Sequence, residues 1–133
     1  MDDIFVGRIM SSPVVTVSSD ASVREAARRM RENDIGSLVV VDDGERLRGI
    51  LTATDFVSAV GDDRSMAEMT VADCMTEVVA TTTANEPIRD VADVMTEHGF
   101  HHVPVVDDER VIGMVTTSDL TAYLSHVEVP SPS

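Results

Sequence analysis

The chain has 133 residues, a net charge of -14 and a pI near 4.4, and all of its ten basic residues are arginine. This length suits one domain, or two small halves that share a core. The acidic surface disfavours binding to the DNA backbone, because we see no basic stripe in the sequence that would displace counterions. At molar salt the Debye length falls to about 3 Å and screens the repulsion between carboxylates, so the charge favours a halophilic source.

The sequence also bears on the compartment in which the protein works. Residues 1–3 lack the basic start and the apolar run of a secretory signal. No apolar stretch is long enough to span a bilayer, so we expect a cytoplasmic protein. Cys74 is the only cysteine and has no internal disulfide partner. We expect it to fill a small apolar space rather than to act as a nucleophile.

The first predicted elements are a strand and an amphipathic helix. Val14–Val17 is short and β-branched, which is typical of a strand. Ser22 and Glu25 have the spacing of a capping box and predict a helix start. The apolar residues that follow recur at helical spacing and define one face of this helix: Val23, Ala26, Ala27 and Met30.

A hairpin and a second helix follow. Leu38–Val41 is a continuous apolar run, which fits a strand covered on both faces. Asp43–Gly44 predicts a tight turn, and Arg46–Leu51 returns as the partner strand. We expect a helix to start around Thr54–Asp55. Gly61–Thr70 is polar and acidic and predicts a linker.

The same order returns after the linker. Pro87 suits the first turn of a helix, and Gly99 suits a left-handed residue that ends it. The apolar face of this helix repeats the helical spacing: Ile88, Val91, Ala92 and Met95. Pro104 lacks an N–H group, so its strand is expected at a sheet edge or with that position unpaired. The chain turns at 107–109, and the last helix is expected to start around Ser118–Asp119.

These two series are copies of one another. An offset of 65 superposes Met10 on Met75, and after Asp43 an offset of 64 continues the match. The copies end in the same phrase, which places Gly49, Thr52 and Asp55 on Gly113, Thr116 and Asp119. We therefore predict an α/β (α+β) fold of two repeats in β-α-β-β-α order. The boundaries are 6–60 for the first repeat, 61–70 for the linker, 71–125 for the second repeat and 126–133 for a flexible tail.

The repeated phrase carries chemistry that suits a nucleotide. A helix N-terminus offers unpaired N–H groups to a phosphate, and hydroxyl side chains add further donors. A carboxylate has two acceptor oxygens, which match the two hydroxyls of a ribose diol. The alternative is that Asp55 and Asp119 only cap helices, which stabilises a helix start by about 1 kcal/mol. For a single copy of the phrase, capping is the better interpretation.

The chain resembles a tandem pair of CBS domains, the cystathionine β-synthase type of regulatory module, over residues 6–124. The resemblance rests on Met10–Val14, Leu38–Asp42, His101–Asp107 and the two G-h-h-T-x-x-D endings. It implies pseudo-twofold symmetry and two clefts, each drawing on both repeats. Such modules bind AMP, ADP, ATP or S-adenosylmethionine as regulatory ligands, with no obligatory cofactor and no metal.

The resemblance also implies a role for individual residues. Asp55 and Asp119 would hold ribose. The phosphate-binding set would be Thr52, Thr54, Thr116, Ser118, His101 and His102. The base pocket of the cleft that uses Asp119 would comprise Pro13, Val15, Ile35, Gly36 and Met114. The base pocket of the other cleft would comprise Ile50, Val78, Ala80 and Phe100, with His101.

The histidines and methionines have simpler alternatives. Adjacent His101 and His102 point to opposite faces of a strand, so they are poorly placed to chelate one metal ion; a surface or hydrogen-bonded pair is the plain alternative. The first repeat has Gly36–Ser37 at this place and no basic group there, so the two clefts are expected to be unequal. Met30 and Met95 are expected in the core.

Three functions remain open at this point. The first is a non-catalytic, homodimeric sensor that binds adenosine ligands and changes shape to signal to an unknown partner protein. The second is an enzyme in which Asp55 and Asp119 act as general bases, although no nucleophile–base pair, metal cluster or glycine-rich phosphate loop is evident. The third is a structural or protein-interaction module whose clefts are empty or hold another ligand. Binding to a nucleic acid through the clefts is less favoured, and binding to a membrane is not expected.

Overall fold

A computed structural model describes residues 4–12, 14–44, 46–62, 65, 67–77 and 80–127, with side chains to residue 125. Pro13 and Val78, both expected in a base pocket, and 128–133, most of the expected tail, lie outside the described residues. The chain forms two compact units. The middle unit is Val14–Val79, and the outer unit combines Met1–Pro13 with Ala80–Ser133.

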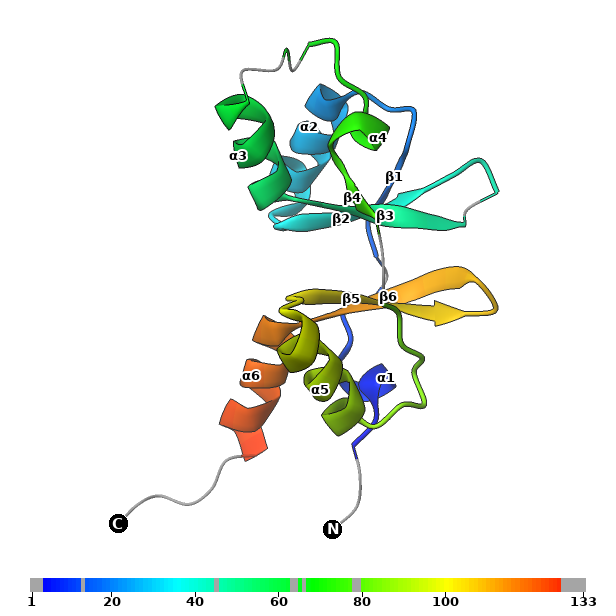
Figure 1. The fold of residues 1–133 in the computed structure, drawn as a ribbon. Coiled ribbons are helices and arrows are strands. Elements are labelled where there is room, and N and C mark those ends of the chain that lie inside the picture. Colours follow the sequence, from blue (N-terminus) through cyan, green and yellow to red (C-terminus); the bar gives the residue numbers. More distant parts are fainter. Residues whose placement is uncertain are drawn as a thin grey trace. The chain divides into compact units, whose positions relative to one another are not determined.

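The middle unit contains a four-stranded sheet with helices on one of its faces (Figure 1). The strand order is β1-β2-β3-β4; β1 pairs with β2 in parallel, and the other pairs are antiparallel. The elements in chain order are β1 (Thr16–Ser18), α2 (Val23–Asn33), β2 (Ser37–Val41), β3 (Leu47–Thr52), α3 (Ala53–Gly61), α4 (Val71–Cys74) and β4 (Thr76–Glu77).

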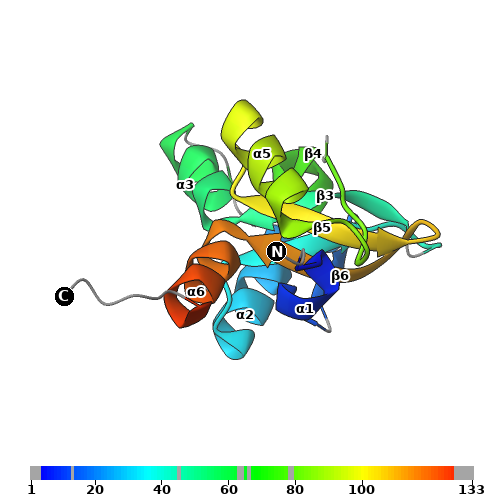
Figure 2. The ribbon, with the colours of Figure 1, turned by 90° about the horizontal axis from the view of Figure 1, so that it is seen from below.

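The outer unit repeats this plan with less regular edges. Helices α1, α5 and α6 cover one face of its β5–β6 hairpin, and Figure 2 views the unit from that helical side. Its elements are α1 (Val6–Ile9), α5 (Ile88–His98), β5 (His102–Asp107), β6 (Arg110–Thr116) and α6 (Thr117–Val127). The first strand of this copy is reduced to a parallel bridge between Thr82 and Val105, and Ser11 bridges to Met114 where β4 pairs in the middle unit.

The helices begin and end largely where the sequence predicts. The Ser22 hydroxyl accepts a hydrogen bond of 3.1 Å from the Glu25 N–H. Gly99 has the left-handed φ of 72° that ends α5, and Asp34 has φ 53° at the end of α2. Because Ala27 is exposed, the apolar face expected on α2 is narrower than its spacing suggests.

The length of the chain suggests one domain or two halves that share a core, but the described residues form a separate apolar core in each unit. In the middle unit, Leu38, Val40 and Leu51 pack with Ala26 and Met30. The core of the outer unit consists of Val6, Val91, Met95, Val103, Val105 and Val115. The predicted core positions of Met30 and Met95 are thus confirmed, and so is the α+β fold of two β-α-β-β-α repeats. Cys74 is half-buried against the middle core, in agreement with a packing role.

Candidate functional site

The repeated phrase lies where a strand passes directly into a helix. In the middle unit, β3 ends at Thr52 and α3 begins at Ala53. The Asp55 carboxylate accepts hydrogen bonds at Oδ2 from the Thr52 N–H (2.8 Å) and from the Thr52 hydroxyl (3.3 Å). The Thr52 side chain in turn accepts from the Asp55 N–H, which completes a capping box.

The outer unit builds the same turn. The Thr116 N–H donates to Asp119 Oδ2 at 2.8 Å, and the Asp119 N–H donates to Thr116 Oγ1 at 3.1 Å. Both aspartates therefore cap helices, as the plainer interpretation of the sequence predicts. Capping uses only Oδ2 of each carboxylate, so the Oδ1 atoms decide what else these groups can bind.

The glycine of the phrase allows a second segment to cross each strand. A Cβ atom on Gly49 would lie 2.6 Å from the Thr76 carbonyl oxygen and 2.9 Å from the Met75 sulfur. A Cβ on Gly113 would lie 2.6 Å from the Met10 sulfur and 3.0 Å from the Ser11 carbonyl oxygen. The crossing segments are themselves repeats of one another, so each phrase lies beside an equivalent hydroxyl residue, Thr76 or Ser11.

Thr76 and Ser11, the crossing residues, differ in whether they form a hydrogen bond with the neighbouring aspartate. The Thr76 hydroxyl donates to Asp55 Oδ1 at 2.9 Å. Within the part of the chain that the structure describes, the Ser11 hydroxyl makes no hydrogen bond, and Asp119 Oδ1 accepts none. Asp55 therefore accepts three hydrogen bonds and Asp119 accepts one.

Two further hydroxyls stand in the first helical turn. Thr54 and Ser118 are exposed, and neither hydroxyl is hydrogen-bonded to any described residue. The N–H groups of Ala53 and Thr117 already donate to carbonyl oxygens, so the hydroxyls of Thr54 and Ser118 are the side-chain donors that each helix start can offer to an anion. Thr52 and Thr116 are half-buried because their side chains take part in the caps.

The expected base-pocket residues fall into three groups. Ile50 and Met114 are buried at equivalent positions of β3 and β6. Val15, Ile35 and Ala80 are half-buried, whereas Gly36 is exposed. Phe100 is half-buried, and its ring stacks on His98 with centroids 5.2 Å apart. An aromatic ring expected beside a base is thus paired with an imidazole.

The adjacent histidines differ in their exposure. His101 is exposed, and its carbonyl oxygen accepts from the Thr117 N–H at 3.1 Å. His102 is half-buried and pairs in the β5–β6 register with Thr116. No group of three His, Cys, Asp or Glu side chains among the described residues is placed to hold a metal ion.

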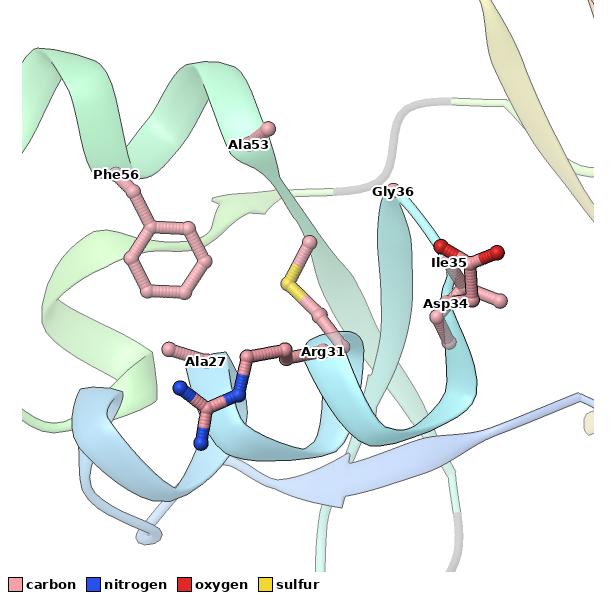
Figure 3. Close-up of a pocket in the computed structure, with 8 residues that line it drawn as sticks. Ala27, Arg31, Asp34, Ile35, Gly36, Ala53 and Phe56 are labelled. Carbon is pink, nitrogen blue, oxygen red and sulfur yellow. The ribbon is translucent and has the colours of Figure 1, made fainter.

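A pocket of about 550 Å³ opens between α2 and α3 of the middle unit. Figure 3 shows the Phe56 ring, the Arg31 side chain and Ala27 around this space, with Ile35 and Gly36 at the end of α2. The Gly36 carbonyl also accepts from the Ala53 N–H at 3.3 Å, which ties the residues after α2 to the start of α3.

Of the residues that line this pocket, the sequence-based site contains only Ile35 and Gly36, and Arg31 and Phe56 are the most informative of those it lacks. The left-handed Asp34 turns the chain back at the end of α2 and brings Gly36 to the same pocket as Arg31. The pocket around Gly36 is therefore lined by one cationic and one acidic residue, Arg31 and Asp34, although position 36 itself has no basic side chain. Phe56 was detectable only as one of the few aromatic residues of the chain, one position after the phrase.

Comparison with known proteins agrees with the repeat. The model of the CBS domain matches the chain twice, at residues 6–62 and 71–126. The chain is 35% identical over 119 residues to hypoxic response protein 1 of Mycobacterium tuberculosis, covering 87% of this chain and 82% of that protein. It is 36% identical to L-aspartate semialdehyde sulfurtransferase of Methanocaldococcus jannaschii, covering 85% of this chain. The match spans about a fifth of that longer enzyme, 22% of its length.

Solved structures show the same architecture. The crystal structure of the CBS domain pair of protein MJ0100, in complex with 5′-methylthioadenosine and S-adenosyl-L-methionine, aligns with a TM-score of 0.88 and 33% identity. That alignment covers 96% of this chain and all of the other (100%). The structure of hypoxic response protein I with two coordinated zinc ions aligns with a TM-score of 0.79 and 29% identity, over 95% of this chain and 99% of that one.

Proposed function

The chain belongs to the CBS domain family, and from that premise we propose that it is a non-catalytic, cytoplasmic regulatory module that binds adenosine-containing ligands. The ligand would be AMP, ADP, ATP or S-adenosylmethionine, and its binding would be passed to a partner protein as a change of conformation. The observation that carries the proposal is that, among the described residues, nothing donates a hydrogen bond to Asp119 Oδ1, at a helix start that also carries the exposed hydroxyl of Ser118.

The ribose would be held by the signature carboxylates. An ionised carboxylate offers about four acceptor sites, so it can receive the 2′- and 3′-hydroxyls together while Oδ2 continues to cap the helix. Hydrogen bonds to a charged group are worth about 1.5–3 kcal/mol, more than those between neutral groups. This difference would give the site its preference for a ligand with a ribose diol over a ligand that lacks the two hydroxyls.

The phosphate or the amino-acid carboxylate of the ligand would lie at the helix starts. The free hydroxyls of Thr54 and Ser118 suit this task, with the caps of Thr52 and Thr116 keeping the turns in shape. His101 and His102 would contribute donors from the outer unit. In the middle unit, we assign this role to Arg31, which lines the pocket with Gly36.

The base would lie against apolar side chains. We retain the expected set as a proposal: Pro13, Val15, Ile35, Gly36, Ile50, Val78, Ala80, Phe100 and Met114. For Phe100 the stacked His98 ring supports contact through the second face or the edge of the phenyl ring.

Homodimerisation and partner binding would use the helices. Val57 and Val60 on α3 are 71% and 63% exposed, and Leu124 on α6 is 61% exposed. Exposed apolar side chains on helices also favour the second candidate function, a protein-interaction module without a nucleoside ligand. Ligand titration separates the two candidates.

The experiment is a calorimetric titration of the chain with AMP, ATP and S-adenosylmethionine in molar KCl. Asp55→Asn and Asp119→Asn each keep an oxygen for the cap and lose the charge. We expect the double variant to bind at least tenfold more weakly than the wild type, with little change in melting temperature. A wild type that binds none of the three compounds, or a double variant of unchanged affinity, would refute the ribose assignment.

A further inference from the structure

We propose that the Thr76 hydroxyl occupies an acceptor site of Asp55. A nucleoside ligand then binds first at the Asp119 signature, and it binds at the Asp55 signature only when it displaces the Thr76 hydroxyl. This inference rests on the proposed function, because it concerns the same two carboxylates. It starts from a hydrogen bond that has no equivalent at Asp119 among the described residues, Thr76 Oγ1 to Asp55 Oδ1 at 2.9 Å.

The count of acceptor sites favours unequal binding. A carboxylate has about four acceptor sites. Asp55 already accepts three hydrogen bonds, so a single site remains for a diol that brings two hydroxyls. Asp119 accepts one and keeps enough sites for both hydroxyls. A ribose must therefore displace a hydrogen bond at Asp55, and it need not do so at Asp119.

The backbone around the two crossing residues is equivalent. Thr76 pairs with Ile50 in the β3–β4 register, and Ser11 forms an antiparallel bridge with Met114. Ile50 and Met114 occupy matching positions of the two repeats. At the crossing, the difference between the signatures therefore comes from the side chain of the crossing residue, and not from where the chain crosses; the Thr52 hydroxyl bond to Asp55 Oδ2 adds a second difference within the phrase.

Threonine and serine differ in how firmly they hold a hydroxyl. Threonine is β-branched and restricted at χ1, whereas serine rotates more freely. The backbone of Thr76 is also fixed, because Gly49 lets its carbonyl come within the space that a Cβ would fill. Thr76 thus presents its hydroxyl to Asp55 in a fixed position. Ser11 forms no such bond and leaves Oδ1 of Asp119 available to a ligand.

Release of Thr76 would also affect the strand that carries it. β4 has only the two residues Thr76–Glu77, and it is the last element of the middle unit in chain order. A ligand that displaces Thr76 removes a contact between β4 and the start of α3. Occupation of the Asp55 signature is thereby coupled to β4, while occupation of the Asp119 signature displaces no such contact among the described residues.

The test isolates each signature and then exchanges the crossing side chains. In the Asp119→Asn chain, calorimetry with S-adenosylmethionine in molar KCl reports the Asp55 signature. Adding Thr76→Val should tighten this binding about threefold to tenfold, the value of one hydrogen bond. Thr76→Ser should have an intermediate effect. In the Asp55→Asn chain, Ser11→Thr should weaken binding at Asp119 by a similar factor.

The outcomes distinguish this inference from the proposed function. Equal affinities at the two signatures, unchanged by Thr76→Val and by Ser11→Thr, would overturn the guarding role and leave nucleoside binding intact. The absence of binding in the wild type and in all variants would overturn both. A melting temperature that stays within about two degrees of the parent chain shows that a changed affinity reflects the site and not a loosened fold.

Discussion

Asp55 and Asp119 each cap a helix, and our proposal assigns their remaining acceptor sites to a ligand. Oδ2 receives the N–H of the threonine at the N-cap, and Oδ1 faces away from that bond. A cap of this kind stabilises a helix start by about 1 kcal/mol, so the residue type is favoured with or without a ligand. Substitution by asparagine separates the two tasks, because it keeps an oxygen for the cap and removes the charge.

Asp42 supplies a pH-dependent contribution to the first hairpin. Its Oδ1 accepts from the N–H groups of Gly44 (2.9 Å) and Arg46 (3.0 Å). The Arg46 N–H hydrogen bond is the main reason why the pKa of Asp42 lies below its ordinary value of 3.8. A lowered pKa stabilises the fold above the ordinary value, and this stabilisation is lost as pH falls through the pKa of the folded state.

We therefore predict that Asp42→Asn lowers the melting temperature at pH 7 and has a smaller effect near pH 3. Differential scanning calorimetry across this range measures the difference. Asp107→Asn is the matched control, because Asp107 has the equivalent position in the second hairpin and its side chain receives no such hydrogen bonds from the described residues. Equal effects of the two variants at every pH would contradict the role of Asp42.

The second hairpin carries backbone strain at its turn. Asp108 and Glu109 connect β5 to β6 and have positive φ values of 50° and 73°. Two consecutive left-handed residues fit the tight turns that match strand twist, which usually contain Asn-Gly or Asp-Gly. A left-handed backbone raises the conformational free energy of an L-residue by about 1–2 kcal/mol, whereas glycine, which has no Cβ, adopts it without this penalty.

Glu109→Gly is accordingly predicted to stabilise the chain by up to about 1 kcal/mol, after the larger backbone entropy of glycine in the unfolded state is subtracted. Urea unfolding in molar KCl measures this change. Glu109→Ala is the control, since it removes the same charge and keeps the Cβ. A glycine variant no more stable than the alanine variant would show that the positive φ is not strained.

Local sequence signals predict the elements well. Three elements depend on residues that lie within a few positions of each other. They are the helix between Ser22 and Asp34, the helix that Gly99 ends, and the buried run Leu38–Val41. The prediction that Ala27 belongs to the buried face of α2 is wrong for a physical reason. Periodicity places it on the edge of the apolar face, but that edge lines an open pocket instead of the core.

The site is predicted less completely than the elements, because its asymmetry depends on distant pairs. The phrase itself marks Asp55 and Asp119, and the structure places both at helix starts. The partner of Asp55 Oδ1 is Thr76, 21 positions away in sequence, and no local pattern identifies it. The same holds for Gly49, whose neighbour is the Met75–Thr76 segment.

At the scale of the whole molecule, the two sequence repeats exchange segments. β4 follows the predicted linker yet pairs with β3 of the first repeat, and the N-terminal Ser11 bridges to Met114 of the second. Neither sequence repeat by itself contains the crossing residue that lies beside its own phrase. The repeat and linker boundaries remain a prediction from sequence. The compact units divide the chain differently, because the outer unit combines residues from both ends of the chain.

The net charge of -14 makes the whole fold dependent on salt. The carboxylates repel each other in the compact state, and this repulsion falls as the Debye length shortens. We predict that the melting temperature rises by several degrees between low salt and molar KCl. Asp43→Asn combined with Asp108→Asn, at two exposed positions, should reduce this rise. A melting temperature independent of KCl would remove the argument for a halophilic source.

The described residues include no helix long and apolar enough to cross a membrane.

The most direct measurement compares adenosine 5′-monophosphate with its 2′-deoxy analogue by calorimetry on the wild-type chain in molar KCl. Our account predicts that the ribose compound binds about tenfold or more tightly, because removing one hydroxyl leaves a charged acceptor of Asp119 unpaired. It also predicts that Asp119→Asn largely abolishes this preference. Equal affinities for the two compounds in the wild type would contradict recognition of the sugar diol by the signature carboxylates.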